Sequence, residues 1–252
     1  MIIIKSPKQI EGIRASSKLA AQSLIHVSKF IKPGISTEEL NTIAHNYIVS
    51  HNAIPAPLNY SGFPKSICTS VNNVVCHGIP STKDILKNGD IINIDITTIL
   101  NGFYGDTSAM YPVGTISPSA KKLIDKTHES MMLAINSLKP GLMLNDCVGK
   151  KIEKFLKPFG FSPIRDLGGH GVGIQFHEDP FVYHFDTNRE NVKLKPGMIF
   201  TVEPMVNASL NWHVDFDKSD GWTVRTADGA LSAQFEHTVL ITTTGCEILT
   251  QL

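Results

Sequence analysis

The feature that most constrains the fold of this chain is an internal duplication. Residues 86–95 (LKNGDIINID) match residues 194–203 (LKPGMIFTVE) in their Leu-Lys-x-Gly start, an aligned isoleucine and a final carboxylate. A second pair of motifs, KPGI at 32–35 and KPGL at 139–142, has almost the same offset. Two unrelated motifs with almost the same offset indicate two similar halves, about 1–115 and 116–252.

Each half is predicted to begin with a helix. Ser6-Pro7 and Ser117-Pro118 open segments with apolar residues at helical spacing, and a Lys-Pro-Gly motif ends each of them. Strand patterns follow later in both halves. Helices followed by strands, twice over, predict an α+β fold with two pseudo-symmetric halves and a site between them. No linker rich in Pro, Gly or Ser separates the halves, so we expect residues 1–252 to form a single domain.

A second helix is predicted after each Pro-Gly. The polar residues Ser36 to Glu39 in the first half and Asn145-Asp146 in the second half are typical helix caps. We expect these helices to run to about Ser50 and Leu156.

The stretch from Asp90 to Ile99 predicts a strand, because isoleucines alternate there with small polar residues. Asn101-Gly102 follows it and is a strong signal for a tight hairpin, in which Thr97 would face Asp106. Asp95 shares a strand face with Thr97, so Asp95 and Asp106 should lie on one diagonal. Two carboxylates that close together repel each other unless a cation or a shared proton lies between them.

Two further acids extend this pattern. For a lone pair of aspartates, a solvated polar face is the simpler explanation. The duplication favours a cation instead, because Glu203 ends the matching strand of the second half. The pattern from Ser232 to Ile241 predicts another strand, with Gln234, Glu236 and Thr238 on one side.

Two histidines lie in a glycine-rich segment, residues 168–178, where glycines let the backbone bend closely around a bound group. A lone histidine is usually structural, but His170 and His177 together with four acids of strand pattern favour a site. His177-Glu178 does not form a zinc-protease helix, because Phe181 stands where the second histidine would be and Pro180 would break the helix.

Four carboxylates with one imidazole form an oxygen-rich set of ligands. Such a set suits two adjacent divalent ions, cobalt, manganese, iron or zinc, whereas a structural zinc site would be rich in thiolates. Two ions roughly 3.5 to 4 Å apart activate water and polarise a carbonyl group. The chemistry implied is hydrolysis.

Charge and cysteine usage exclude several other classes of function. Lys plus Arg equals Asp plus Glu at 23 each, so there is no basic surface for a nucleic acid substrate. No segment has the pattern of a signal peptide or a membrane span. The four cysteines form no Cys-x-x-Cys pair, which fits a reducing compartment, and we expect a cytoplasmic protein.

Several motifs resemble those of the type I methionine aminopeptidases, metallopeptidases of the pita-bread fold, over nearly the whole chain. In chain order they are Asn59–Ser66, Val74–Pro80, Asn93–Asp95, Gly105–Ser108, Gly169–Gly173, Glu203–Met205 and Gln234–Thr238. The resemblance implies an antiparallel sheet with flanking helices and a metal site between the halves. It also implies hydrolytic removal of the initiator methionine from nascent proteins when the second residue is small.

The resemblance assigns roles to individual residues. It implies five metal ligands: Asp95, Asp106, His170, Glu203 and Glu236. Asp106 and Glu236 would bridge two ions. His77 and His177 would contact the substrate and the tetrahedral intermediate, and Glu203 would help to move the proton of the attacking water. The pocket for the methionine side chain would be lined by Tyr60, Phe63, Cys68, Phe176 and Trp222, whose aromatic rings and sulfur suit a thioether.

The short interval between Glu203 and Glu236 lacks the insertion of eukaryotic type II relatives, so a bacterial-style enzyme is expected. Pro57, Ser61 and the segment Asn211–Phe216 depart from the family's usual residues. We expect a monomer that contacts the ribosome transiently and acts on the N-terminal methionine of nascent peptides. The alternatives are an X-Pro peptidase of the same fold and a non-catalytic binding module that has lost its metals.

Overall fold

The computed structural model describes residues 1–187, 189 and 191–251. Its helices are α1 (Pro7–Ser28), α2 (Thr37–Ser50), α3 (Pro118–Ile135), α4 (Leu144–Cys147) and α5 (Gly149–Leu156), with 3₁₀ turns at Tyr60–Gly62 and Lys157–Phe159. The strands of the first half are β1 (Ile54–Pro55), β2 (Cys68–Val71), β3 (Val74–Cys76), β4 (Ile91–Leu100) and β5 (Phe103–Pro112). Those of the second half are β6 (Ser162–Pro163), β7 (Gly169–Gly171), β8 (Glu178–Val182), β9 (Ile199–Val202), β10 (Met205–Asn207), β11 (Val214–Phe216), β12 (Val224–Thr226), β13 (Ser232–Gln234), β14 (Glu236–Ile241) and β15 (Cys246–Ile248).

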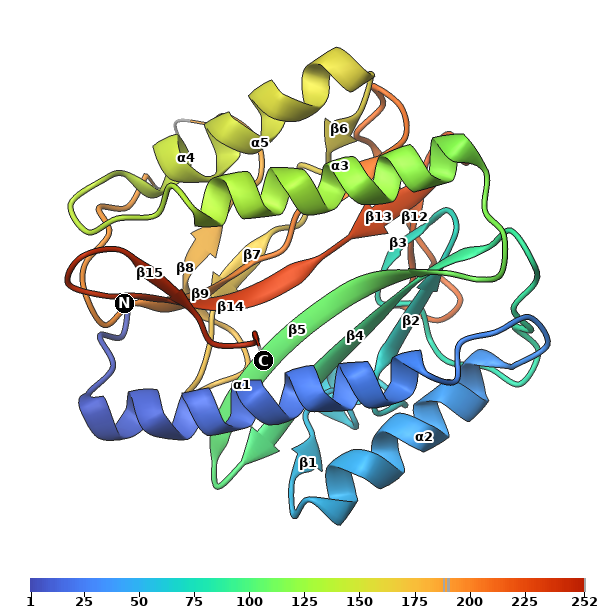
Figure 1. Ribbon diagram of the computed structural model, residues 1–252, viewed down its shortest axis with the longest axis horizontal. Helices are drawn as coiled ribbons and strands as arrows, with labels where there is room; N and C mark the ends of the chain where they lie inside the picture. Colours follow the sequence, from blue (N-terminus) through green and yellow to red (C-terminus); the bar gives the residue numbers. More distant parts are fainter. Residues whose placement is uncertain (188, 190, 252) are drawn as a thin grey trace.

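In the described residues a nine-stranded antiparallel sheet joins the two halves. Its main order is β1-β4-β5-β14-β9-β7-β8, with β2 paired to β4 and β15 paired to β14. The long helices α1 and α3 lie on the same side of this sheet, α1 over the first half and α3 over the second (Figure 1). The continuous sheet supports our proposal that the chain is one internally duplicated domain. It also puts the junction of the halves, β5 against β14, at the centre.

The repeated motifs make the same contacts in each half. The Gly34 N–H donates to the Leu86 carbonyl at 2.8 Å, and the Gly141 N–H donates to the Leu194 carbonyl at 2.8 Å. Both glycines have a positive φ, 93° and 87°, which side chains disfavour. The Lys-Pro-Gly motif therefore turns the chain a few residues after the first helix of each half and hydrogen-bonds to the leucine of the Leu-Lys-x-Gly motif.

The hairpin predicted at Asn101-Gly102 is confirmed. Strands β4 and β5 pair with Thr97 opposite Asp106 and Asp95 opposite Ser108. The predicted starts of three helices are also confirmed, because the side chains of Ser6, Ser36 and Ser117 each cap a helix by accepting the N–H three residues on.

The prediction for the second helix of the second half is wrong at its start. Asn145 is not the cap, since the helix begins at Leu144 and is interrupted at Val148 before α5. The Asn145 side chain instead donates to Asp186 at 3.1 Å. A Cβ on Gly149 would lie 2.2 Å from the Phe185 carbonyl oxygen. The loop at Phe185 therefore passes too close to the start of α5 for any residue with a side chain at this position.

The predicted strand from Ser232 to Ile241 is divided. Strand β13 pairs with β10, and after Phe235 the chain continues as β14 between β5 and β9. The alternation of side chains survives, but the backbone changes its partners at this point. A pattern of alternating residues predicts which side chains share a face and does not identify the strand's neighbours.

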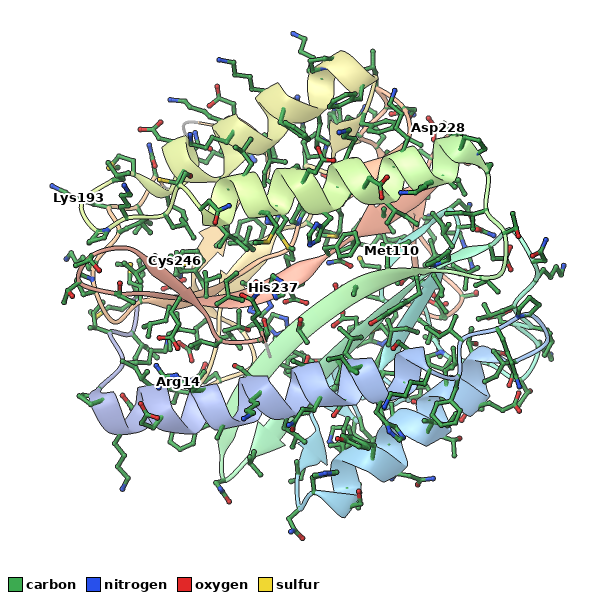
Figure 2. The ribbon with its side chains drawn as sticks, in the orientation of Figure 1. Arg14, Met110, Lys193, Asp228, His237 and Cys246 are labelled. Atoms are coloured by element: carbon green, nitrogen blue, oxygen red, sulfur yellow. The ribbon has the colours of Figure 1, made fainter. Side chains whose placement is uncertain are left out.

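Apolar side chains fill the space between the helices and the sheet in both halves (Figure 2). The larger core packs α3 and α5 against β9 and β14, with Leu123, Ile152 and Phe200 fully buried. A second core packs α1 and α2 against β4. In the part of the chain that the structure describes, no helix has the length and apolar character needed to cross a membrane.

The approach of α1 to β5 leads to a stability prediction. A Cβ on Gly105 would lie 2.2 Å from the backbone nitrogen of Ser17. The clash is with backbone, so movement of a neighbouring side chain cannot relieve it. We expect Gly105→Val to lower the free energy of unfolding by about 3 kcal/mol, as overpacked cores do. Urea denaturation measures this. Gly245→Ala is the control, because nothing lies within 4 Å of its Cβ position, and an equal loss in both variants would contradict the close packing of α1 on β5.

Candidate active site

One cavity of about 690 Å³ collects residues from both halves of the chain. Every site residue predicted from the sequence lines it: Tyr60, Phe63, Cys68, His77, Asp95, Asp106, His170, Phe176, His177, Glu203, Trp222 and Glu236. The central strands position its acids in a simple order. Moving across the sheet, β4 carries Asp95, β5 carries Asp106, β14 carries Glu236, and Glu203 directly follows β9.

The junction of the halves fixes the two central acids. Glu236 stands opposite Ser108 in the pairing of β14 with β5. On the same strands, the Thr238 hydroxyl donates to the Asp106 carbonyl at 2.7 Å, and the Thr107 hydroxyl donates to the Glu236 carbonyl at 2.8 Å. A threonine hydroxyl on each strand thus binds the backbone carbonyl of the acid on the other strand.

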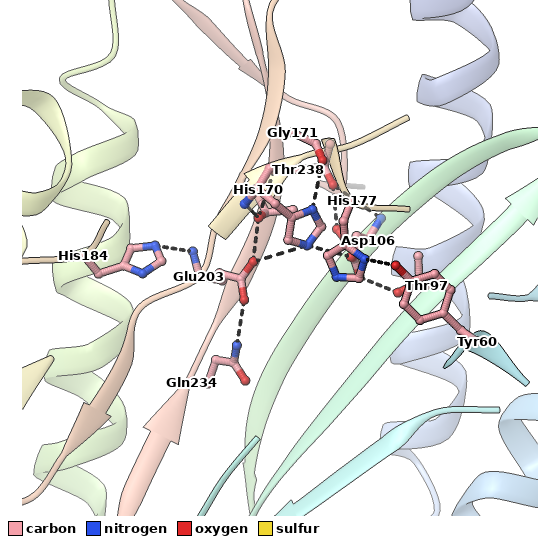
Figure 3. Close-up of polar contacts among 11 residues, drawn as sticks. Tyr60, Thr97, Asp106, His170, Gly171, His177, His184, Glu203, Gln234 and Thr238 are labelled. Atoms are coloured by element: carbon pink, nitrogen blue, oxygen red, sulfur yellow. Dashed lines mark hydrogen bonds and ion pairs between the residues drawn. The ribbon is translucent and has the colours of Figure 1, made fainter. Parts of the chain in front are cut away.

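His170 on β7 faces the acids through one defined ring nitrogen. Its Nδ1 lies 2.9 Å from the Gly171 carbonyl, which can only accept, so Nδ1 carries the hydrogen. Nε2 is left with a free lone pair, 3.7 Å from Asp106 Oδ2 and 3.6 Å from Glu203 Oε1 (Figure 3). A second ring nitrogen fixed by a carbonyl is the usual arrangement of a metal-binding histidine.

Ligand atoms of Asp106, His170 and Glu236 all lie within 4.8 Å of one another. Glu203 contacts His170 beside this group, and Asp95 lines the same cavity on the neighbouring strand. The described residues therefore bring the predicted acids and His170 to one place, with the three-residue group as its tightest part.

Four supporting residues were not predicted as site residues. Hydroxyls donate to carboxylates at 2.6 Å, Thr97 to Asp106 and Thr201 to Glu203. The Gln234 amide donates to the other Glu203 oxygen at 3.2 Å, and the Glu203 N–H donates to the buried ring of His184 at 3.0 Å. Thr97 and Thr201 each lie two residues from an acid on a strand, and this spacing could have indicated their role from the sequence. Gln234 has the same spacing from Glu236, whereas nothing local to His184 indicates its contact.

Burial raises the pKa of all four acids, and their mutual repulsion adds to the effect for Asp95, Glu203 and Glu236. The pKa of Asp106 rises to about 7, although the hydrogen bond from Thr97 opposes the shift. Burial lowers the pKa of His170 to about 3, with the nearby charge of His177 adding to the effect, so its imidazole is neutral at pH 7.

These groups fit a divalent cation. Buried carboxylates that repel one another are costly to ionise without a cation between them, and a neutral imidazole is the form that ligates metals. The donor set of carboxylate oxygens and one imidazole nitrogen suits cobalt, manganese, iron or zinc.

Aromatic side chains and two further histidines form the rest of the cavity wall. The His177 Nδ1 lies 2.9 Å from the Tyr60 hydroxyl, and its ring stacks on Phe176 at 4.4 Å between centroids. The Trp222 ring lies edge-on to Phe63 at 5.2 Å and to His77 at 5.9 Å.

His77 has a left-handed backbone, φ 56°, which is strained for a residue with a side chain. The next residue is fixed, because a Cβ on Gly78 would lie 2.1 Å from the Thr69 carbonyl oxygen. The strained turn therefore aims His77 at the cavity while the chain stays in contact with β2.

The residues that depart from the family pattern have different positions. Pro57 lines the cavity, and Ser61 has a left-handed backbone in the exposed turn beside it. The segment Asn211–Phe216 does not line the cavity; its end forms β11, which pairs with β12 just after Trp222.

Comparison with known proteins gives strong matches over almost the full length. The sequence profile of metallopeptidase family M24 matches residues 11–243. The methionine aminopeptidase of Rickettsia prowazekii is 51% identical over 99% of this chain and 95% of its own length, and that of Escherichia coli K12 is 50% identical over 99% and 94%. The crystal structure of the Thermotoga maritima methionine aminopeptidase superposes with a TM-score of 0.96 at 38% identity, covering all of both chains.

Proposed function

The chain belongs to metallopeptidase family M24, and from its similarity to methionine aminopeptidases over nearly its whole length we propose that it is a type I methionine aminopeptidase. It hydrolyses the bond after an N-terminal methionine when the second residue is small, as in the removal of the initiator methionine from nascent proteins. The observation that carries the proposal is one cavity that holds the acid and histidine cluster together with an apolar pocket of aromatic rings and sulfur.

The proposed metal ligands are Asp95, Asp106, His170, Glu203 and Glu236. We propose that they hold two divalent ions, cobalt, manganese, iron or zinc, with Asp106 and Glu236 shared between the ions. Ligand atoms of Asp106, His170 and Glu236 lie close together and all five residues line the same cavity, which supports this. When bound, the ions supply an activated water and polarise the carbonyl to be attacked.

The remaining steps are assigned to side chains of this chain. Glu203 takes the proton of the attacking water and passes it to the leaving amine, and the hydroxyl of Thr201 and the amide of Gln234 hold its carboxylate in place. His77 and His177 hydrogen-bond the reacting carbonyl as it becomes tetrahedral. Burial lowers the pKa of His177 to about 4, so its ring is neutral at pH 7 and keeps one N–H to donate.

The methionine side chain is proposed to lie among Tyr60, Phe63, Cys68, Phe176 and Trp222. These groups are apolar and polarisable, and an unbranched thioether packs well against aromatic edges. Phe63 and Cys68 are buried at this wall, whereas Tyr60 is partly exposed. We further propose that the enzyme acts as a cytoplasmic monomer in transient contact with the ribosome, which a role in processing nascent chains would favour.

Peptide selectivity tests this function. We expect release of methionine from Met-Ala-Ser and from peptides with Gly, Ser or Pro in second place. Met-Lys and Met-Phe peptides should be cleaved about 100-fold less efficiently, because the second residue packs beside the metals in a crowded cleft. Formyl-Met-Ala-Ser should resist, since a free amine is expected near the metals. Chromatography of the released methionine gives kcat/KM for each peptide.

The same assay separates the alternatives. An X-Pro peptidase would cleave peptides with proline in second place regardless of the first residue, and a non-catalytic module would cleave none. Efficient cleavage of Met-Lys-Ser would contradict the proposed crowding at the second residue.

A further inference from the structure

A buried ion pair outside the proposed catalytic groups joins the N-terminus to the loop that carries His177. Lys5 Nζ lies 2.5 Å from Glu178 Oε2, and the two side chains are 1% and 2% exposed. Every other Lys or Arg ion pair between side chains of the described residues leaves at least 23% of each side chain exposed. A buried pair returns little net stability, because desolvation of both charges offsets their attraction. Its presence therefore calls for a role other than stability.

The carboxylate of Glu178 closes the loop before it. Its Oε1 accepts the N–H of Ile174 at 2.7 Å and the N–H of Gln175 at 2.9 Å, while Oε2 accepts Lys5. Phe176 and His177 lie between the backbone groups that this carboxylate binds and Glu178 itself. One side chain thus fixes the short turn from which both of them reach the cavity.

Lys5 is fixed in turn at its backbone. Its N–H donates to the Gly197 carbonyl at 2.9 Å, in the turn that precedes β9 and leads to Glu203. Burial lowers the pKa of the Lys5 ammonium, and the hydrogen bond and charge of Glu178 oppose that shift. The N-terminal segment thereby links two separate parts of the site, the turn before Glu203 and the loop of His177.

We propose that Glu178, held by Lys5, is a positioning residue that sets the place of His177 and Phe176 in the cavity. This inference rests on the proposed function for its catalytic consequence. His177 has contacts that depend on its placement, since its ring lies 4.2 Å from the ring of His170 and its Nδ1 meets the Tyr60 hydroxyl. A shift of about 1 Å in such a group can lower a rate by two orders of magnitude.

A double-mutant cycle tests the inference with Met-Ala-Ser as substrate. Glu178→Gln should lower kcat about 10-fold or more, with a smaller change in KM and unchanged metal content. In a His177→Ala background the same change should cost less than about twofold, because Glu178 acts through His177. Equal losses in both backgrounds would overturn the proposal, since a general structural defect gives additive effects.

Hydrogen exchange supplies a readout that does not depend on activity. Amides of residues 173–178 should exchange faster in Glu178→Gln than in the wild type, and unchanged exchange would also overturn the proposal. Arg14→Met is the control, because it removes an ion pair between distant segments, Arg14 with Glu247, that does not line the cavity. It should change neither kcat nor exchange in this loop. If Glu178→Gln does not fold, Lys5→Met/Glu178→Gln removes both buried charges and is tested in the same way.

Failure of the proposed function is a separate result. A wild-type protein that releases no methionine from Met-Ala-Ser contradicts the peptidase assignment, and the exchange measurement then still decides whether Glu178 holds the loop. Release by the wild type together with additive losses contradicts the positioning role alone.

Discussion

Replacing Asp106 by asparagine should abolish methionine release and lower metal content while the fold survives. Asp106 stands at the junction of the halves, its carboxylate contacts His170, and its ligand atoms group with those of Glu236. An amide of the same shape keeps the hydrogen bond from Thr97 but supplies no charge for two cations. We expect kcat/KM to fall on the order of 10³-fold or more, measured with metal analysis on the same sample.

The control for this change is Asp125→Asn, which removes an exposed aspartate that pairs with Lys121 on α3. It should leave turnover and metal content unaltered. The metal-free Asp106→Asn protein should melt no lower than the metal-free wild type, because one of the repelling buried acids is gone. Near-normal turnover in Asp106→Asn would rule out a shared metal ligand at this position.

Three histidines in the cavity should respond differently to substitution by alanine. Only His170 presents a lone pair to the acids with its other nitrogen fixed by a carbonyl. His170→Ala should therefore weaken metal binding, with partial recovery in excess metal. His77→Ala and His177→Ala should keep their metal and lose about 10²-fold in kcat/KM, because they remove hydrogen bonds made in the transition state.

Metal content, melting temperature and kcat/KM decide this for each variant. His51→Ala is the control, since His51 is exposed at the end of α2 and lies outside the cavity. If His177 is only structural, His177→Ala will melt at a lower temperature with unaltered turnover per folded molecule. Metal loss in His77→Ala or His177→Ala, but not in His170→Ala, would reverse the assigned roles.

The sequence predicted the parts of this fold whose causes are local or repeated. The Asn101-Gly102 turn alone sets the register that brings Asp95 and Asp106 to one face, and the structure has that register. The Lys-Pro-Gly motif, repeated at almost the same offset as the Leu-Lys-x-Gly motif, predicted two similar halves, and both of its glycines have a positive φ. The cap at Asn145 failed for a nonlocal reason, since its side chain binds Asp186, 41 residues away.

Contacts between distant segments account for the features that the sequence did not predict. Lys5 and Glu178 are 173 positions apart, and each alone reads as an ordinary surface charge. His184 supports the Glu203 backbone from a buried position that its neighbours in the sequence do not reveal. The chain changes its strand partners at Phe235, between β13 and β14, which alternation of polar and apolar residues cannot indicate.

Removal and return of metal is the most direct measurement of the proposed chemistry. Protein stripped by a chelator should release no methionine from Met-Ala-Ser, and titration with cobalt or manganese should restore release in step with binding of up to two ions per chain. The Asp106→Asn protein should not recover under the same titration. Undiminished release of methionine by the stripped wild-type protein would contradict a metal-dependent aminopeptidase at this site.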